Sequence, residues 1–386
     1  MDFELSEDQA AYQDAARTFA RNELAPRAAE WDAQAHFPTD VIAQAGELGF
    51  CGLYTPEAAG GLGLSRLDAA IVFEELAAGC TSTAAYLTIH NMAAWMIATW
   101  GSEALKSEWA ESLALGQRLA SYALTEPNAG SDAASLRTRA VRDGDSYVLN
   151  GGKAFTSGAG DTDILVVMAR TGGEGPKGIS AFAVPADTPG ISYGRKEEKM
   201  GWNSQPTRSV TFEDARIPAT HLLASEGEGF KLAMKGLDGG RINIATCSVG
   251  TAQAALDAAQ RYMRERKQFG HAIADFQALQ FKLADMATEL VAARQMVRLA
   301  AAKLDAGDAN LTAYCAMAKR FATDAGFKIC NEALQIHGGY GYLRDYPLER
   351  HVRDTRVHQI LEGTNEVMRV IVGRRMLDEG ATEAIR

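Results

Sequence analysis

Apolar residues recur at three- and four-residue spacings through the first 120 residues, which is the pattern of amphipathic helices. We predict that the first helix begins after Ser6, a suitable N-cap, and bends or ends at Pro26, because proline cannot donate a helical hydrogen bond. Thr39 is expected to cap the next helix. The predicted helices after the first cover 41–48, 66–78 and 83–100. Residues 1–120 are therefore predicted to form an α-helical domain.

The pattern changes after residue 120. Short runs of β-branched and aromatic residues alternate there with Gly, Asp and Pro. Asp143-Gly144 separates Val141-Arg142 from the run Tyr147 to Leu149, which is typical of a β-hairpin. Further strands are predicted over 164–168, 179–184 and 209–212. We predict a small β domain over residues 121–227.

Long Ala-rich segments with helical spacing and no internal proline return from residue 228. They cover 229–268, 275–306, 310–336 and 364–377. Antiparallel helices of this length form a bundle, so residues 228–386 are predicted to be a third, helical domain. Because the strands are confined to the middle of the chain, the predicted fold class is α+β, mostly α, and not a doubly wound dinucleotide-binding fold.

The charge balance narrows the range of partners. There are 39 Lys and Arg residues against 49 Asp and Glu, a net charge of -10, which disfavours nucleic acid and anionic membrane surfaces. No stretch reaches the ~20 apolar residues of a membrane span, and the first residues lack the basic start of a targeting peptide. We therefore expect a soluble, intracellular protein with no membrane insertion.

The residues that usually bind metals or attack as nucleophiles lack the necessary spacing. The five cysteines form no C-x-x-C pair, so neither a zinc site nor a disulfide framework is predicted, and buried thiols in a reducing compartment are expected. The seven histidines include no H-E-x-x-H motif, and no G-x-S-x-G motif is present. No metal and no serine nucleophile are predicted.

Glu362 is a candidate base. It follows the apolar pair Ile360-Leu361 and precedes Gly363 and Thr364, on a short connection before a helix that Thr364 is expected to cap. A glutamate in such a place is usually a solvated loop residue. Its apolar neighbours would instead raise the pKa of its carboxyl, so that it accepts a proton from a carbon acid near neutrality.

Several glycine-containing segments allow two interpretations. In 238–241, Asp-Gly-Gly-Arg, each glycine costs ~1 kcal/mol in a helix and indicates either close helix packing or the floor of a pocket beside Arg241. Segment 122–132 is either an interdomain turn or a source of backbone donors to a ligand. Segment 337–342 either ends a helix or holds a phosphate. The basic residues in 264–270 are explained by favourable interaction with the C-terminus of a helix.

Four motifs together resemble one family over nearly the whole chain, in family order and near family spacing. They are T-E-P-x-x-G-S-D at 125–132, R-K-x-F-G at 266–270, Q-x-x-G-G-x-G at 335–341 and E-G-T at 362–364. This combination resembles the acyl-CoA dehydrogenases. The resemblance implies an N-terminal helical domain, a middle β-barrel-like domain and a C-terminal four-helix bundle, with bound FAD and a homotetramer built as a dimer of dimers.

The resemblance also implies roles for individual residues. Glu362 matches the catalytic base, and Gly239-Gly240 cannot supply the alternative base that some relatives place there. The implied FAD contacts, partly to a neighbouring subunit, are Tyr122, Leu124, Thr125, Ser131, Phe155, Thr156, Ser157, Arg266, Phe276, Gln277, Gln335, Gly338, Gly339, Thr364 and Glu366. The implied acyl-CoA contacts are Ser131, Asp238, Gly239, Gly240, Arg241 and Arg374. Many medium-chain members have Trp and Thr where Phe155 and Ser157 stand here.

The implied reaction is α,β-dehydrogenation of an acyl-CoA, with electrons passed to electron-transfer flavoprotein. Motifs at 81–86, 89–92, 201–208, 239–245 and 337–342 resemble the subgroup that oxidises isobutyryl-CoA in valine breakdown. Butyryl-CoA and 2-methylbutyryl-CoA are alternative substrates. An oxidase, a desulfinase and a noncatalytic acyl-CoA-binding protein are alternative functions. The expected location is the cytoplasm of a bacterium, or the mitochondrial matrix for a mature eukaryotic form.

Overall fold

The computed structural model describes residues 4–378, 380 and 385, so the outermost parts of the predicted first and third domains lie outside the described residues. The first helix, α1 (Glu7–Phe19), has Ser6 as its N-cap, as predicted: the Ser6 side chain accepts a hydrogen bond from the Gln9 backbone N–H. A π-turn over Ala20–Leu24 follows, and α2 begins only at Ala28. The helix is therefore interrupted around Pro26, as predicted.

The remaining N-terminal helices include one that was not predicted. They are α3 (Thr39–Glu47), α4 (Arg66–Gly79), α5 (Thr81–Trp100) and α6 (Glu103–Ala114). Thr39 begins α3 itself and Pro38 occupies the cap position, so the predicted cap was wrong by one residue. Leu105, Trp109 and Leu113 form the buried face of α6, so the four-residue spacing that indicates this helix is present in the sequence.

The middle of the chain forms one eight-stranded sheet in the order β6-β7-β3-β2-β4-β5-β8, with β1 paired parallel to β4. The strands are β1 (Ala120–Ala123), β2 (Arg139–Asp143), β3 (Ser146–Ser157), β4 (Ile164–Arg170), β5 (Ile179–Pro185), β6 (Ile191–Tyr193), β7 (Thr207–Pro218) and β8 (Leu222–Leu223). The predicted hairpin is β2–β3: Asp143 pairs with Ser146 across a turn in which Gly144 has φ +60°.

Strands β3 and β7 are much longer than predicted. Each has 12 residues, and their pairing shifts register between Leu149 and Gly151 and again between Lys153 and Thr156. The adjacent Gly151 and Gly152 resemble a chain break in the sequence, but they lie within a strand that bulges and continues. Strand β4 is buried on both faces, because its side chains alternate between a core shared with the helices and a core inside the sheet.

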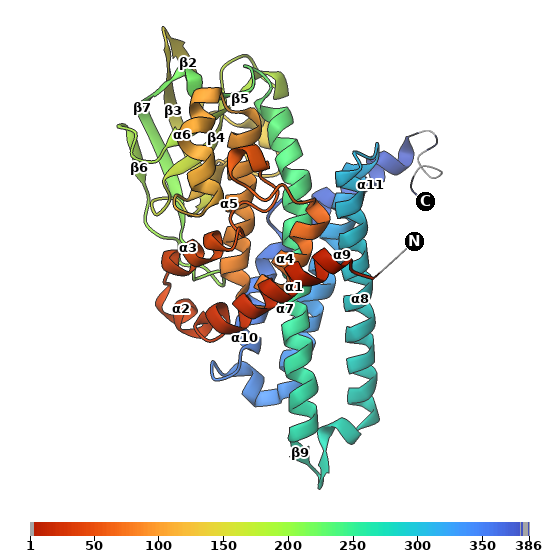
Figure 1. Ribbon diagram of the computed structural model, residues 1–386. Helices are drawn as coiled ribbons and strands as arrows, with labels where there is room; N and C mark the ends of the chain where they lie inside the picture. Colours follow the sequence, from red (N-terminus) through yellow and green to blue (C-terminus); the bar gives the residue numbers. More distant parts are fainter. Residues whose placement is uncertain (1–3, 379, 381–384, 386) are drawn as a thin grey trace.

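The chain then forms a helical bundle of α7 (Gly229–Glu265), α8 (Gln277–Asp305), α9 (Leu311–His337), α10 (Leu348–Arg356) and α11 (Asn365–Leu377) (Figure 1). Helix α7 contacts α8 and α9, and also α4 and α5 from the first part of the chain. It ends at Glu265, before the predicted end, because Lys267–Gln268 (β9) pairs with His271–Ala272 (β10). Helix α10 was not predicted, since its buried side chains include the polar His351, Asp354 and Thr355.

All five cysteines are free and buried, as expected. Burial raises the pKa of the thiols of Cys51, Cys247, Cys315 and Cys330 to about 12. Within the described residues, no helix is long and apolar enough to cross a membrane. The same residues include no cluster of three or more His, Cys, Asp or Glu side chains suited to a metal ion.

Candidate active site

Glu362 lies on a sharp turn just before α11. Its φ is +56° and that of Gly363 is +88°, so two successive residues have left-handed backbone conformation. This conformation costs a non-glycine residue ~1–2 kcal/mol, so the surroundings of the turn must hold it. Thr364 then caps α11 by accepting a hydrogen bond from Val367 N–H (3.3 Å), as predicted.

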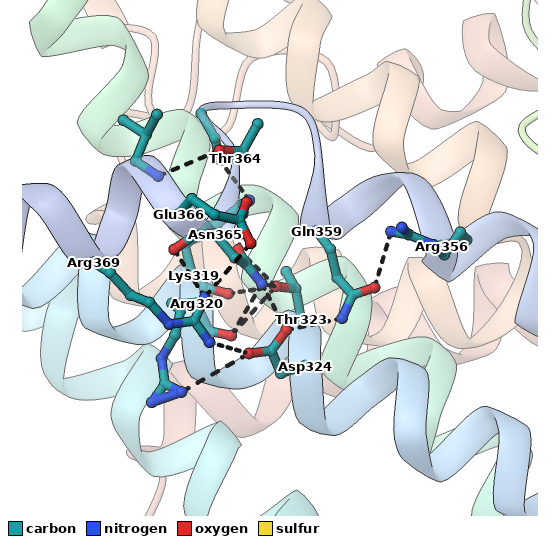
Figure 2. Close-up of polar contacts among 12 residues, drawn as sticks. Lys319, Arg320, Thr323, Asp324, Arg356, Gln359, Thr364, Asn365, Glu366 and Arg369 are labelled. Atoms are coloured by element: carbon teal, nitrogen blue, oxygen red, sulfur yellow. Dashed lines mark hydrogen bonds and ion pairs between the residues drawn. The ribbon is translucent and has the colours of Figure 1, made fainter. Parts of the chain in front are cut away.

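A polar network on α9 holds this turn from below (Figure 2). Lys319 Nζ donates to the Gly363 carbonyl (2.7 Å) and to Asn365 Oδ1 (2.9 Å). Asp324 Oδ1 accepts hydrogen bonds from Gln359 Nε2 (2.8 Å) and Asn365 Nδ2 (2.7 Å), one donor from each side of the turn. The backbone around Glu362 is thus fixed at both ends to one rigid helix.

The glycine pair on α7 makes room for two charged side chains. A Cβ atom at Gly240 would lie 2.4 Å from Glu362 Oε2, and one at Gly239 would lie 2.5 Å from Arg66 Nη1. No side chain fits at either position unless the charged group moves. The glycine pair therefore gives room to the Glu362 carboxylate, which lies directly over Gly240, and to the Arg66 guanidinium over Gly239.

The carboxyl of Glu362 has the environment of a general base. Its Oε2 atom is buried and finds no hydrogen-bond partner among the residues that the structure describes. Burial raises the pKa of Glu362 to about 7, although the positive charges of Arg241 and Lys319 act in the opposite direction. Near neutral pH a substantial fraction is therefore an unpaired carboxylate, which can accept a proton.

The predicted acyl-CoA contacts Asp238 and Arg241 pair with each other on α7. Arg241 Nη1 lies 2.6 Å from Asp238 Oδ1, and Thr312 Oγ1 donates to Asp238 Oδ2 (2.9 Å). Burial raises the pKa of Asp238, and the neighbouring guanidinium limits that rise. The ion pair with Asp238 thus fixes the guanidinium of Arg241, whose positive charge acts to lower the pKa of Glu362. Arg374, in contrast, is exposed on α11.

Three aromatic side chains and one more cation complete the pocket. The hydroxyl of Tyr122 on β1 is buried without a partner within the described chain, and burial together with the Glu362 carboxylate raises its pKa. The Arg66 guanidinium lies 3.5 Å from the ring centroid of Tyr54 and 4.7 Å from that of Trp95. None of the described carboxylates forms an ion pair with this guanidinium, and cation–π contacts of this kind stabilise its buried charge.

Sequence reasoning missed Arg66, Tyr54, Trp95 and Lys319. Lys319 had a usable signal, because it lies on the face of α9 that also carries the buried Cys315 and Ala322. Charged side chains are rarely buried unless they have partners, so a lysine on the apolar face of a helix indicates a specific polar interaction. Arg66 had no such signal, since its partners come from segments distant in the sequence.

The predicted flavin-edge residues lie on β3 and beside β1. Phe155 has φ +55° and is 70% exposed, while the adjacent Thr156 Oγ1 is buried and unpartnered in the described part of the chain. The Ser157 carbonyl accepts a hydrogen bond from Ser121 Oγ (2.7 Å). Leu124 and Thr125 are tied to the same strand, because their carbonyls accept from Lys153 Nζ (3.1 Å) and Ala154 N–H (2.8 Å). Ser131 is exposed.

A second group of predicted cofactor residues lies elsewhere in the chain. Arg266, Gly338 and Gly339 line a groove of about 380 Å³. Gln277 and Gln335, which are close in sequence to the residues that line this groove, are both exposed. The ring of Phe276 packs edge-on against that of Phe269. This end of the bundle carries β9, away from α11 (Figure 1). The chain therefore does not bring these residues to Glu362, and Glu366, also predicted, points its exposed side chain outward.

The fold and this site define a known class of enzyme. Models of the N-terminal, middle and C-terminal domains of acyl-CoA dehydrogenase match residues 6–117, 121–215 and 227–377. The chain therefore belongs to the acyl-CoA dehydrogenase family and is an oxidoreductase, as the sequence motifs predicted.

Similar proteins extend over nearly the full length. Mitochondrial isobutyryl-CoA dehydrogenase of Bos taurus is 55% identical over 97% of this chain and 90% of its own. The mitochondrial isobutyryl-CoA dehydrogenase of Dictyostelium discoideum is 54% identical over 96% of this chain and 90% of its own.

Solved structures share the fold closely. Butyryl-CoA dehydrogenase of Megasphaera elsdenii has a TM-score of 0.95 at 40% identity, covering 98% of this chain and 100% of that one. A chain from a structure of the electron transferring flavoprotein of Acidaminococcus fermentans has a TM-score of 0.96 at 43% identity, with coverage of 98% and 100%. PigA with FAD and proline has a TM-score of 0.94 at 29% identity, with coverage of 97% and 99%. These comparisons confirm the predicted three-part fold.

Proposed function

We propose that this acyl-CoA dehydrogenase oxidises a short branched-chain acyl-CoA, converting isobutyryl-CoA to methacrylyl-CoA, and passes the electrons to electron-transfer flavoprotein. The two isobutyryl-CoA dehydrogenases more than half identical to the chain support the substrate. The similarity to a chain from a structure of an electron transferring flavoprotein supports the acceptor.

One observation carries the proposed chemistry: the unpaired Oε2 of Glu362 lies over Gly240, in a pocket that raises the pKa of the carboxyl to about 7. Glu362 removes the proton from the α carbon of the thioester, and the electrons of that C–H bond form the new double bond. Arg241 and Lys319 limit the cost of placing the carboxylate in this pocket. Gly239 and Gly240 leave the space above α7 that the Arg66 guanidinium and the Glu362 carboxylate occupy.

FAD is the cofactor of the family, and the residues present fit it. The buried, unpartnered Thr156 Oγ1 and Tyr122 hydroxyl provide polar groups for the flavin ring system, and the exposed ring of Phe155 provides a surface to pack against. Arg266 and the glycines at 338 and 339 suit the pyrophosphate, since a guanidinium and bare backbone can approach its oxygens closely. When bound, FAD supplies the acceptor for the hydride that leaves the β carbon.

We further propose a homotetramer, built as a dimer of dimers, in which the groove of one subunit completes the cofactor site of a neighbour. The separation of that groove from Glu362 within one chain supports the shared site. For a bacterial source we propose a cytoplasmic enzyme, and for a eukaryotic source a mitochondrial matrix enzyme like the two mitochondrial relatives.

Glu362→Gln tests the base. The variant is expected to remain a folded yellow protein that binds acyl-CoA, but anaerobic addition of isobutyryl-CoA should not bleach its flavin, because an amide cannot accept the α proton. Bleaching at the wild-type rate would exclude Glu362 as the base.

The substrate is tested by anaerobic titration of the wild-type protein with isobutyryl-, butyryl- and 2-methylbutyryl-CoA. We expect isobutyryl-CoA to bleach the flavin fastest. Faster bleaching by another of these thioesters would identify that thioester as the substrate and leave the family unchanged. Lack of bleaching by all three would favour a noncatalytic acyl-CoA-binding protein.

A further inference from the structure

Lys319 is a cation enclosed within the protein. Its side chain is 0% exposed, and no carboxylate of the described residues lies within ion-pair distance of its ammonium group. Its two hydrogen-bond acceptors, the Gly363 carbonyl and Asn365 Oδ1, are both neutral. Enclosing an ammonium ion costs several kcal/mol unless its interactions replace its hydration. A neutral side chain of similar length would be cheaper if Lys319 only filled space.

The acceptors of Lys319 identify what it holds. Gly363 follows Glu362 directly, and both residues have positive φ. Asn365 begins α11 on the other side of this strained turn. Because Lys319 projects from α9, a long helix packed against α7, its ammonium group is a fixed point relative to Gly240. The carboxylate of Glu362 has only a narrow space above Gly240, so a small movement of the turn would displace it.

We propose that Lys319 is a positioning residue for the catalytic base: its ammonium group holds the Glu362-Gly363 turn against α9 and places a positive charge behind the carboxylate. This inference rests on the proposed role of Glu362. Lys319 acts on the base through its hydrogen bond to the Gly363 carbonyl and through its positive charge.

The charged and titratable groups around the base determine the expected pH dependence. Arg241 on α7 and Lys319 on α9 both favour the carboxylate, while the Tyr122 and Tyr54 hydroxyls face it from β1 and from the loop before α4. The negative charges of Glu362, Asp324 and Glu366 favour the charged form of Lys319, and the positive charge of Arg241 opposes it. Burial lowers the pKa of Lys319 to about 8, so it still carries its charge at the pH where Glu362 titrates. Removing that charge should move the acidic limb of the reaction to higher pH.

The test is the pH dependence of flavin bleaching by isobutyryl-CoA in single-turnover, stopped-flow experiments with the holoenzyme. For Lys319→Met we expect the midpoint of the acidic limb to rise by about one pH unit. We also expect the rate at the alkaline plateau, per bound flavin, to fall about tenfold or more, because the base is held less accurately. Lys328→Met is the matched control, since Lys328 lies on the same helix but is paired with Glu289 at the surface. Its profile should match wild type.

A purely structural role of Lys319 predicts a different result. The Lys319→Met protein would then unfold at lower temperature and bind less FAD, but its midpoint and its plateau rate per bound flavin would equal those of wild type. That outcome would overturn the inference. If Glu362→Gln still bleaches in the same assay, the assignment of the base fails instead, so the two failures are distinguishable.

Asn365→Ala provides a second variant should Lys319→Met not fold with FAD. It removes one acceptor of Lys319 but keeps the buried charge. The inference expects a lowered plateau with an unchanged midpoint. An unchanged plateau would contradict it.

Discussion

At the scale of single residues, the environment that suits Glu362 to its proposed catalytic role also lowers the stability of the fold when the carboxyl is ionised. Burial raises the pKa of its carboxyl to about 7 from an ordinary value of 4.5. The native protein therefore binds this proton more tightly than the unfolded chain does. The stabilisation from Glu362 is fully present below pH 4.5 and is lost as the pH rises through about 7.

Glu362→Gln should consequently stabilise the protein at alkaline pH. At pH 8 the native wild type holds an ionised, buried carboxylate whose cost is on the order of 3 kcal/mol, and the amide removes it. At pH 4.5 to 5 the two proteins should differ little. Urea unfolding at both pH values measures the effect, with Glu366→Gln as the exposed control. Equal stabilisation at both pH values would contradict the raised pKa.

Gly240→Ala should impair the reaction without breaking the helix. A methyl group 2.4 Å from Glu362 Oε2 forces the carboxylate to move by about 1 Å, a displacement that costs ~100-fold in rate. Gly236→Ala on the same helix is the control, because its Cβ would meet Met92 and Met96 sulfur atoms at an ordinary 3.4 Å. Single-turnover bleaching of the two holoenzymes gives the comparison. Equal rates would show that the carboxylate does not act over Gly240.

The sequence indicated Glu362 and the glycine pair because local patterns carried the information: an apolar run before a turn, and glycines within a helix. It did not indicate the relation between them, in which Gly240 makes room for a carboxylate 122 positions further along the chain. Arg66 was missed for the same reason, since its partners become neighbours only when the helices pack.

At the scale of elements, an enclosed ion pair fixes the segment after β1 to β3. The side chains of Lys153 and Glu126 are 0% and 8% exposed and lie 2.8 Å apart. The Glu126 carboxylate also accepts hydrogen bonds from the backbone N–H groups of Arg137 (2.6 Å) and Thr138 (2.9 Å). This glutamate of the T-E-P motif therefore fixes the backbone of the predicted flavin-binding segment through its ion pair and hydrogen bonds.

Lys153→Met should destabilise the protein by about 3–5 kcal/mol, because it leaves the Glu126 carboxylate enclosed without its cation. FAD occupancy should fall with it, since Leu124 and Thr125 belong to the segment that loosens. Lys106→Met, which breaks a surface pair with the exposed Glu103, should cost at most about 1 kcal/mol. Urea unfolding and the flavin-to-protein ratio would reveal an error if the two variants behaved alike.

Helices were predicted better than strands. Periods of three and four residues survive in the packed bundle, whereas Gly151 and Gly152 hid the continuity of β3 behind a bulge. Helix α10 was hidden by its polar buried residues, such as Asp354, which accepts from Trp202 N–H (2.7 Å). Prediction from the spacing of apolar residues assumes that polar residues face water. It fails for a helix whose buried face carries polar residues that bond to one another or to the backbone.

At the scale of the whole molecule, large apolar side chains gather near the groove that contains Arg266. Phe269 is 90% exposed, Tyr342 81% and Phe281 60%. Clustered exposed apolar residues, here beside the groove proposed for FAD, are typical of a surface that another subunit covers. The proposed tetramer would cover them.

Phe269→Ser should weaken this assembly and reduce FAD retention together, because the loss of one apolar contact acts on a shared site. Sedimentation velocity at decreasing protein concentration, combined with the flavin-to-protein ratio, measures both. Val141→Ser, a 57% exposed residue on β2, is the control and should change neither. A Phe269→Ser protein that dissociates while keeping all its FAD would refute the shared site.

The buried cysteines have a practical consequence. A thiol with a pKa near 12 is almost entirely protonated at pH 8, and maleimides and iodoacetamide react with the thiolate. Alkylation of these four thiols in the native enzyme should therefore be slow, and each should gain its label only when its part of the chain opens. Because Cys51, Cys247, Cys315 and Cys330 are spread over the helical parts at both ends of the sequence, mass spectrometry after timed labelling would measure the rate of local opening in each region without any introduced probe.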